Sequence, residues 1–230
     1  MRYLSRKKIY HKEESNKDAK KVYIFCEGKE TEIRYFKYFQ GLSSNIDILP
    51  IPSVNGQSDP LKLKENADLL FFGNEMHSPR FSLSVEYKDE VWFVIDTDRW
   101  NEGDKINRLK EFCNAKNGLN MQWIVAQSNP CFELWFFYHF NDKMPVKSDV
   151  EKYASFKEFL DITIKGGFDS RSMPVEIETA IVNSKNNFQS IAGQPALYST
   201  EVHHLGDVIV PFVKKQLDKA KAMMLNNEAL

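Results

Sequence analysis

The sequence VYIFCEGKETEIRYF, residues 22–36, places a short apolar strand, an acidic turn and a helical pattern in immediate succession. Val22 to Cys26 is a β-branched and aromatic run with little alternation, as expected for a strand that is buried on both faces of a parallel sheet. Glu27 and Gly28 follow at once, and from Glu30 to Gln40 apolar residues recur at helical spacing. The succession predicts one strand-turn-helix unit of an α/β fold.

The chain up to Phe140 repeats this alternation. Further strands are predicted at 46–51, 91–95 and 121–125, and helices at 59–72, 105–116 and 132–140. The last of these is an almost uninterrupted apolar and aromatic run that is too short to span a membrane and is typical of a buried helix. We therefore predict a mostly parallel sheet flanked by helices.

Three more helical patterns follow, at 155–164, 175–188 and 203–224, with glycine and proline between them. We divide the chain into a basic N-terminal leader (1–21), an α/β core (22–145) and a helical extension packed on the core (146–230). The leader carries many lysine and arginine residues against few acids. It is either a solvated tail or an arm that contacts phosphate groups.

Composition limits the classes of protein to consider. A chain of 230 residues with 42% hydrophobic residues can bury a substantial core. The net charge of −1 means that binding of nucleic acid would need a local basic surface. The N-terminus lacks a signal-peptide pattern and the chain lacks a membrane-spanning run, so we expect a cytoplasmic protein without membrane association. Cys26, Cys113 and Cys131 form no CxxC pair, which argues against structural zinc and for a reducing compartment.

Acidic residues follow two of the predicted strands at the point where each strand ends. Glu27 follows the first strand, and Asp96 and Asp98 follow the strand at 91–95. Because the carboxyl ends of parallel strands meet at one edge of a sheet, these three side chains are expected to converge. Oxygen ligands without nearby cysteine or histidine favour Mg²⁺ or Mn²⁺. The alternative for a lone DxD is that it caps a turn or the next helix.

Two further acids are candidates for the same site. Glu32 lies in the first turns of the predicted helix, where it either favours the helix dipole or serves as ligand to a second metal ion. Glu133 lies in the very apolar helix, where an unpaired carboxylate is costly to bury. We therefore expect Glu133 to meet a cation or a hydrogen-bond donor near the site.

Polar and basic residues flank the acids. Lys29 and Arg99 either balance the carboxylates at the surface or neutralise a phosphate group. Ser128 and Asn129, before Pro130, either end a strand and cap the next helix or contact a phosphate at the same sheet edge.

Four strings carry a resemblance to a known family: VYIFCEGKETEIRYF, VWFVIDTD, SNPCFELWFFYHF and STEVHHL. Their order and intervals resemble those of the RloB-like family, whose core is of the Toprim type, over most of the chain. That family is similar to the AbiL second component and is associated with bacterial phage defence and with a neighbouring ABC-type or AAA-type ATPase. The wider Toprim group includes topoisomerases, primases, ribonuclease M5-like enzymes and OLD-type nucleases.

The resemblance implies roles for named residues. In the Toprim fold an acid after the first strand and a DxD after a later strand bind Mg²⁺, and by motif matching these are Glu27, Asp96 and Asp98. Glu32 looks like the second acid of OLD-type nucleases, although its spacing here is longer. A second ion held through Glu32 or Glu133 is optional.

The expected function is a Mg²⁺-dependent nuclease that cleaves phosphodiester bonds of DNA or RNA, including tRNA, in abortive-infection defence, with an ATPase partner. Lys29 or Arg99 would add a positive contact to the scissile phosphate, and Ser128 and Asn129 would bind substrate. Two alternatives stay open: a non-catalytic adaptor subunit of an ATPase complex, and nucleotidyl transfer as in primases.

Overall fold

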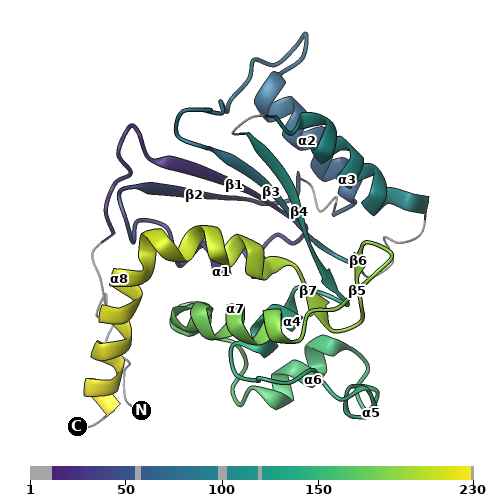
Figure 1. Ribbon diagram of the computed structural model, residues 1–230, viewed down its shortest axis with the longest axis vertical. Helices are drawn as coiled ribbons and strands as arrows, with labels where there is room; N and C mark the ends of the chain where they lie inside the picture. The colour runs from purple at the N-terminus through teal and green to yellow at the C-terminus, as the bar shows by residue number, and fades with distance from the viewer. Residues whose placement is uncertain (1–11, 55–57, 98–102, 119–120, 229–230) are drawn as a thin grey trace.

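The computed structural model describes residues 12–54, 58–97, 103–118 and 121–228, and a five-stranded sheet lies at its centre (Figure 1). The order of the strands across the sheet is β2 (Ile46–Ile51), β1 (Lys20–Cys26), β3 (Glu90–Asp96), β4 (Gln122–Asn129) and β7 (Ser199–Thr200). Neighbours among the first four are parallel, and β7 pairs antiparallel with β4. The predicted α/β class, with a mostly parallel sheet flanked by helices, is confirmed.

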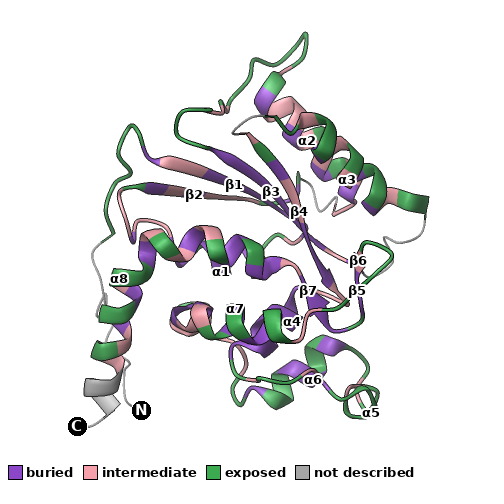
Figure 2. Cartoon of the chain, viewed as in Figure 1, coloured by how far each residue is buried: buried purple, intermediate pink, exposed green. Residues whose placement is uncertain are grey.

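Alternate residues of β1 pack into two different cores, one on each face of the sheet. The sequence of β1 therefore shows no polar face. Tyr23 and Phe25 pack with residues of α2 (Pro60–Phe72) and α3 (Lys105–Lys116). Ile24 and Cys26 pack into a larger cluster on the opposite face. Figure 2 shows the central strands as buried. The carboxyl ends of the strands are thus the part of the sheet that is open to a ligand.

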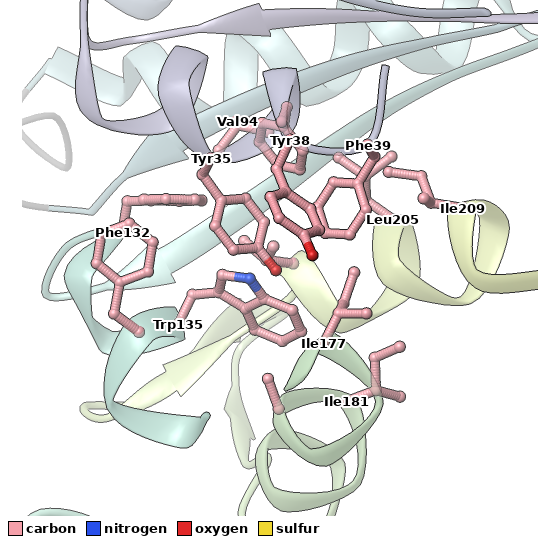
Figure 3. Packing of buried hydrophobic residues seen from close by; sticks show 14 of the residues in the cluster. Tyr35, Tyr38, Phe39, Val94, Phe132, Trp135, Ile177, Ile181, Leu205 and Ile209 are labelled. Atoms are coloured by element: carbon pink, nitrogen blue, oxygen red, sulfur yellow. The ribbon is translucent and has the colours of Figure 1, made fainter. Parts of the chain in front are cut away.

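The larger cluster is formed by helices that are distant in sequence. They are α1 (Thr31–Lys37), α4 (Glu133–Tyr138), α7 (Ile177–Asn186) and α8 (Val202–Glu228). The rings of Tyr35 and Trp135 pack edge to face, with their centroids 6.4 Å apart (Figure 3). A Cβ added at Gly206 would lie 2.8 Å from the Ile181 side chain, so the glycine permits the close packing of α7 on α8.

The predicted helical extension is present and also contributes strands. Its other elements are α5 (Lys147–Val150), α6 (Phe156–Thr163), a 3₁₀ helix (Met173–Glu176), β5 (Ser190–Ile191) and β6 (Gln194–Pro195). β5 and β6 form a separate two-stranded sheet, and β7 joins the central one. Phe156 and Phe159 of α6 belong to the larger cluster, so the extension shares a core with the residues before it. No helix among the described residues is both long enough and apolar enough to cross a membrane.

The predicted end of one strand is wrong. The strand predicted to end at Val125 continues to Asn129, because Ser128 pairs with Asp96 on one side and Thr200 on the other. The next helix begins at Glu133, one residue after its predicted start, and its N-cap residue, Phe132, makes no side-chain cap hydrogen bond. Ser128 and Asn129 thus do not cap this helix. In the predicted leader, β1 begins at Lys20, and residues 1–11 lie outside the described part of the chain.

The buried His139 predicts a loss of stability in acid. Its Nδ1 lies 2.9 Å from the Trp135 carbonyl oxygen, which can only accept, so Nδ1 carries the proton and Nε2 faces the Tyr35 hydroxyl at 3.2 Å. Burial lowers the pKa of His139 from 6.5 to about 3. The unfolded chain therefore binds this proton first as pH falls. The free energy of unfolding that the neutral imidazole contributes above pH 6.5 should therefore be lost between pH 6.5 and about pH 3. The loss should be up to about 1.4 kcal/mol per pH unit.

Urea unfolding of the wild type and His139→Gln between pH 7.5 and pH 4 measures this contribution. The variant should be less stable at pH 7.5 but lose less stability on acidification. His77→Gln, at an exposed histidine, controls for removal of an imidazole. Equal acid sensitivity of His139→Gln and the wild type would contradict the assignment.

Candidate functional site

The ends of β1 and β3 are joined by the side chain of Glu27. The Glu27 amide continues the ladder by donating to the Val94 carbonyl oxygen at 3.1 Å. The Glu27 carboxylate in turn accepts a hydrogen bond from the Asp96 amide at 2.9 Å. Because the strands are parallel neighbours, two acids 69 residues apart in the sequence meet at one sheet edge, in agreement with the general rule for open α/β sheets.

Asp96 connects the same edge to the segment before α4. Its Oδ1 accepts a hydrogen bond from the Phe132 amide at 2.7 Å. Asp96 also pairs with Ser128 in the register of β3 and β4. The chain that leaves β4 therefore turns back over the sheet edge, and Glu133, the first residue of α4, is brought to the site.

Glu32 folds back from the first turn of α1 onto the turn that follows β1. Its Oε1 accepts a hydrogen bond from the Gly28 amide at 3.0 Å. A Cβ at position 28 would lie 2.9 Å from the Glu32 carboxyl carbon and still closer to one of its oxygens. Glycine at this position therefore permits the approach of the Glu32 carboxylate to the backbone.

Glu133 is 7% exposed and meets a cation, as expected for a buried carboxylate. The cation is Lys157 of α6, whose Nζ lies 3.0 Å from Glu133 Oε1. Sequence reasoning did not find Lys157. It occupies an exposed position of an amphipathic helix, and only the packing of α6 beside α4 reveals its role.

These side chains line one cavity of about 400 Å³ at the carboxyl edge of the sheet. The lining residues are Glu27, Gly28, Lys29, Glu30, Thr31, Glu32, Ser58, Asp96, Glu133 and Lys157. Five carboxyl groups thus face two ammonium groups. The cavity is strongly acidic although the chain as a whole is nearly neutral.

The excess of carboxylates changes the protonation of the site. Burial, followed by the charges of Glu27, Glu32 and Glu133, raises the pKa of Asp96 well above its ordinary value. Burial also raises the pKa of Glu32, against the lowering effect of the hydrogen bond from Gly28. A cation that enters the cavity would relieve this repulsion and favour the ionised carboxylates.

The donor set fits a hard divalent cation in chemical type, because every acidic lining group offers carboxylate oxygen. Among the described residues, however, no three histidine, cysteine or acidic side chains already form a metal-binding group. Asp98, the third member of the predicted Glu27, Asp96 and Asp98 set, lies outside the described residues. That set therefore stays a prediction, with Mg²⁺ or Mn²⁺ as the ion.

The predicted substrate contacts have different positions. Lys29 lines the cavity, whereas Arg99 lies outside the described residues. Ser128 is fully buried with its hydroxyl 2.7 Å from that of Thr200, and Asn129 Nδ2 donates to the Pro195 carbonyl oxygen at 2.9 Å. These contacts hold β7 and β6 against β4, and neither residue lines the cavity.

Cys131 lies beside the acidic cluster but is not suited to nucleophilic catalysis. Burial, followed by the charges of Glu133 and Asp96, raises the pKa of its thiol far above the ordinary value. The thiolate, which is the nucleophilic form, is therefore disfavoured. Cys26 and Cys113 are buried in the two cores, as expected for packing thiols.

The family model for RloB-like proteins matches residues 22–208. The chain belongs to this family. The matched range of the RloB-like chain includes every acid of the cavity and also Lys157. No curated protein and no solved structure matches the chain.

The ion pair of Lys157 with Glu133 predicts competition with a metal ion. In Lys157→Met the ammonium is lost while the cavity acids remain, so repulsion among them increases. The variant should bind Mn²⁺ roughly fivefold more tightly, since a charge pair with one solvent-exposed partner contributes about 1 kcal/mol. Without divalent ions it should melt at a lower temperature than the wild type.

Mn²⁺ titration followed by electron paramagnetic resonance of the free ion measures the affinity. Lys165→Met, at an exposed lysine just beyond α6, is the matched control and should bind Mn²⁺ as the wild type does. Weaker binding by Lys157→Met than by the wild type would show that the ammonium does not oppose the ion.

Proposed function

We propose that this chain is a metal-dependent nuclease that hydrolyses phosphodiester bonds. The observation that carries the proposal is the convergence of Glu27, Glu32, Asp96 and Glu133 on one cavity at the carboxyl edge of a parallel sheet. Buried carboxylates that repel one another are stabilised by a cation, and a cation in such a site is suited to a phosphate substrate.

Glu27 and Asp96 would hold the divalent ion, together with Asp98 by motif matching. When bound, the ion would supply positive charge to the scissile phosphate and a more acidic water molecule. Lys29 and Lys157, which line the cavity, would bind and neutralise the non-bridging oxygens of the phosphate. Glu32 has a pKa raised by burial, which suits it to accept a proton from the attacking water.

Membership of the RloB-like family supports a proposal for the cellular role of this nuclease. We place the protein in the cytoplasm, in phage defence of the abortive-infection type, with an ABC-type or AAA-type ATPase as partner. The free cysteines of the described residues agree with a reducing compartment. The substrate class is nucleic acid, either DNA or RNA.

Asp96→Asn is the most direct test, because it removes charge and preserves shape. The amide oxygen can still accept from the Phe132 amide, so the fold should survive. Mn²⁺ affinity should fall, and cleavage should fall roughly 100-fold or more, since the lysines cannot replace the ion. Cleavage of labelled DNA and tRNA with Mg²⁺, with and without the ATPase, measures the effect.

Asp149→Asn is the control, because Asp149 is an exposed acid of α5 that pairs with Lys152. It should cleave as the wild type does. Cleavage by Asp96→Asn at the wild-type rate would contradict the mechanism. A wild type that cleaves no substrate, even with the ATPase, while partner-dependent toxicity persists in Asp96→Asn, would favour the adaptor function instead.

A further inference from the structure

A second hollow, of about 560 Å³, lies on the exposed side of α1, and we call it the α1 groove. Its lining residues are Arg34, Lys37, Phe168, Asp169, Ser170 and Arg171. The first two come from α1, and the others come from the loop between α6 and the 3₁₀ helix. Two segments that are far apart in sequence therefore form its walls.

The groove is basic, in contrast to the acidic cavity. Three of its lining residues are cationic and one, Asp169, is acidic. Arg171 pairs with Asp169 through Nε at 2.8 Å and Nη2 at 3.2 Å, and its side chain is 87% exposed. Lys37 has no ion pair within the described part of the chain. An anion that enters the groove thus meets the Lys37 ammonium group and two exposed guanidinium groups, of which Arg34 pairs with Glu30 and Arg171 with Asp169.

The groove also contains an aromatic ring in a fixed orientation. Phe168 stacks on Phe136 of α4 with ring centroids 3.8 Å apart and an interplanar angle of 4°. Phe168 also meets Tyr35 and His139, and it is only half-buried and lines the groove. Cationic groups beside an accessible aromatic ring are the combination that binds single-stranded nucleic acid, through phosphate contacts and base stacking.

The α1 groove and the acidic cavity adjoin along α1. Arg34 lines the groove and pairs at 2.7 Å with Glu30, which lines the cavity. Glu30 and Arg34 are one turn apart, so the two hollows meet along the exposed face of α1. A strand with one phosphodiester bond in the cavity would therefore reach the groove within its next few nucleotides.

We propose that the α1 groove binds single-stranded nucleic acid next to the cavity, with Lys37, Arg34 and Arg171 on the backbone phosphates and Phe168 under a base. This inference rests on the proposed nuclease function, for which it specifies a single-stranded substrate. A duplex has its bases stacked internally, so it cannot use the Phe168 ring in the same way.

The test measures binding without cleavage. Asp96→Asn protein in EDTA is titrated into fluorescein-labelled single-stranded DNA, single-stranded RNA and the corresponding duplexes, and anisotropy is followed at several KCl concentrations. Lys37→Glu together with Arg171→Glu should weaken single-strand binding about tenfold or more. The slope of log K against log salt should decrease by about 0.7 for each phosphate that the protein no longer neutralises.

Two further variants make the result specific. Phe168→Leu keeps an apolar side chain against Phe136. It should weaken the binding of single strands severalfold and change the binding of duplexes little. Arg108→Glu reverses an exposed charge on α3, on the opposite face of the sheet, and should leave binding unchanged. Circular dichroism and melting temperatures show that each variant is folded.

The outcomes separate this inference from the proposed function. The groove proposal is overturned if Arg108→Glu weakens binding as much as the groove variants, or if duplexes bind as tightly as single strands. Neither result bears on the nuclease proposal, because the cleavage assay tests that proposal separately. If the groove variants alone lose single-strand binding and the wild type cleaves nothing, the groove proposal holds and the nuclease proposal fails.

Discussion

Two backbone-to-carboxylate hydrogen bonds at the edge of the sheet determine where the rest of the site lies. The Asp96 amide donates to Glu27, and the Phe132 amide donates to Asp96. Together they join the ends of β1 and β3 to the segment that leads into α4. Each bond also brings a carboxylate into a partly buried position, so the same contacts that fix the local geometry accumulate negative charge. The acidic cavity is a direct result of this way of joining the strands.

The accumulated charge requires a rigid support, because carboxylates that repel one another would otherwise separate. The support comes from the two apolar clusters on either side of the sheet and from the close contacts of α1, α4, α7 and α8. Trp135, Tyr35 and their neighbours hold α4 against α1, and these two helices carry Glu133 and Glu32. A preorganised arrangement of charged groups is what electrostatic catalysis requires, since it avoids reorganisation during the reaction.

Much of the fold could be predicted from residue patterns, because strands buried on both faces require continuous β-branched and aromatic runs. The acidic edge was predictable for the same reason, since Glu27 and Asp96 directly follow such runs. The end of β4 was not, because it depends on pairing with β7, a two-residue strand that has no periodicity of its own. Lys157 was missed because an exposed lysine in an amphipathic helix has no local signal of a distant partner.

The charged residues of the cavity and of the α1 groove come from different parts of the chain, so the helical extension contributes charge as well as packing. The cavity acids come from segments at or before α4, whereas Lys157 and Arg171 come from α6 and the loop after it. The position of this later segment therefore sets how much of the negative charge of the cavity is neutralised. Because α6 is held mainly by Phe156, Phe159 and Leu160 in the shared core, a loosening of that packing would change the electrostatics of the site without altering any of its acids. The stability of the extension and the charge balance of the site are thus coupled through the same three apolar side chains.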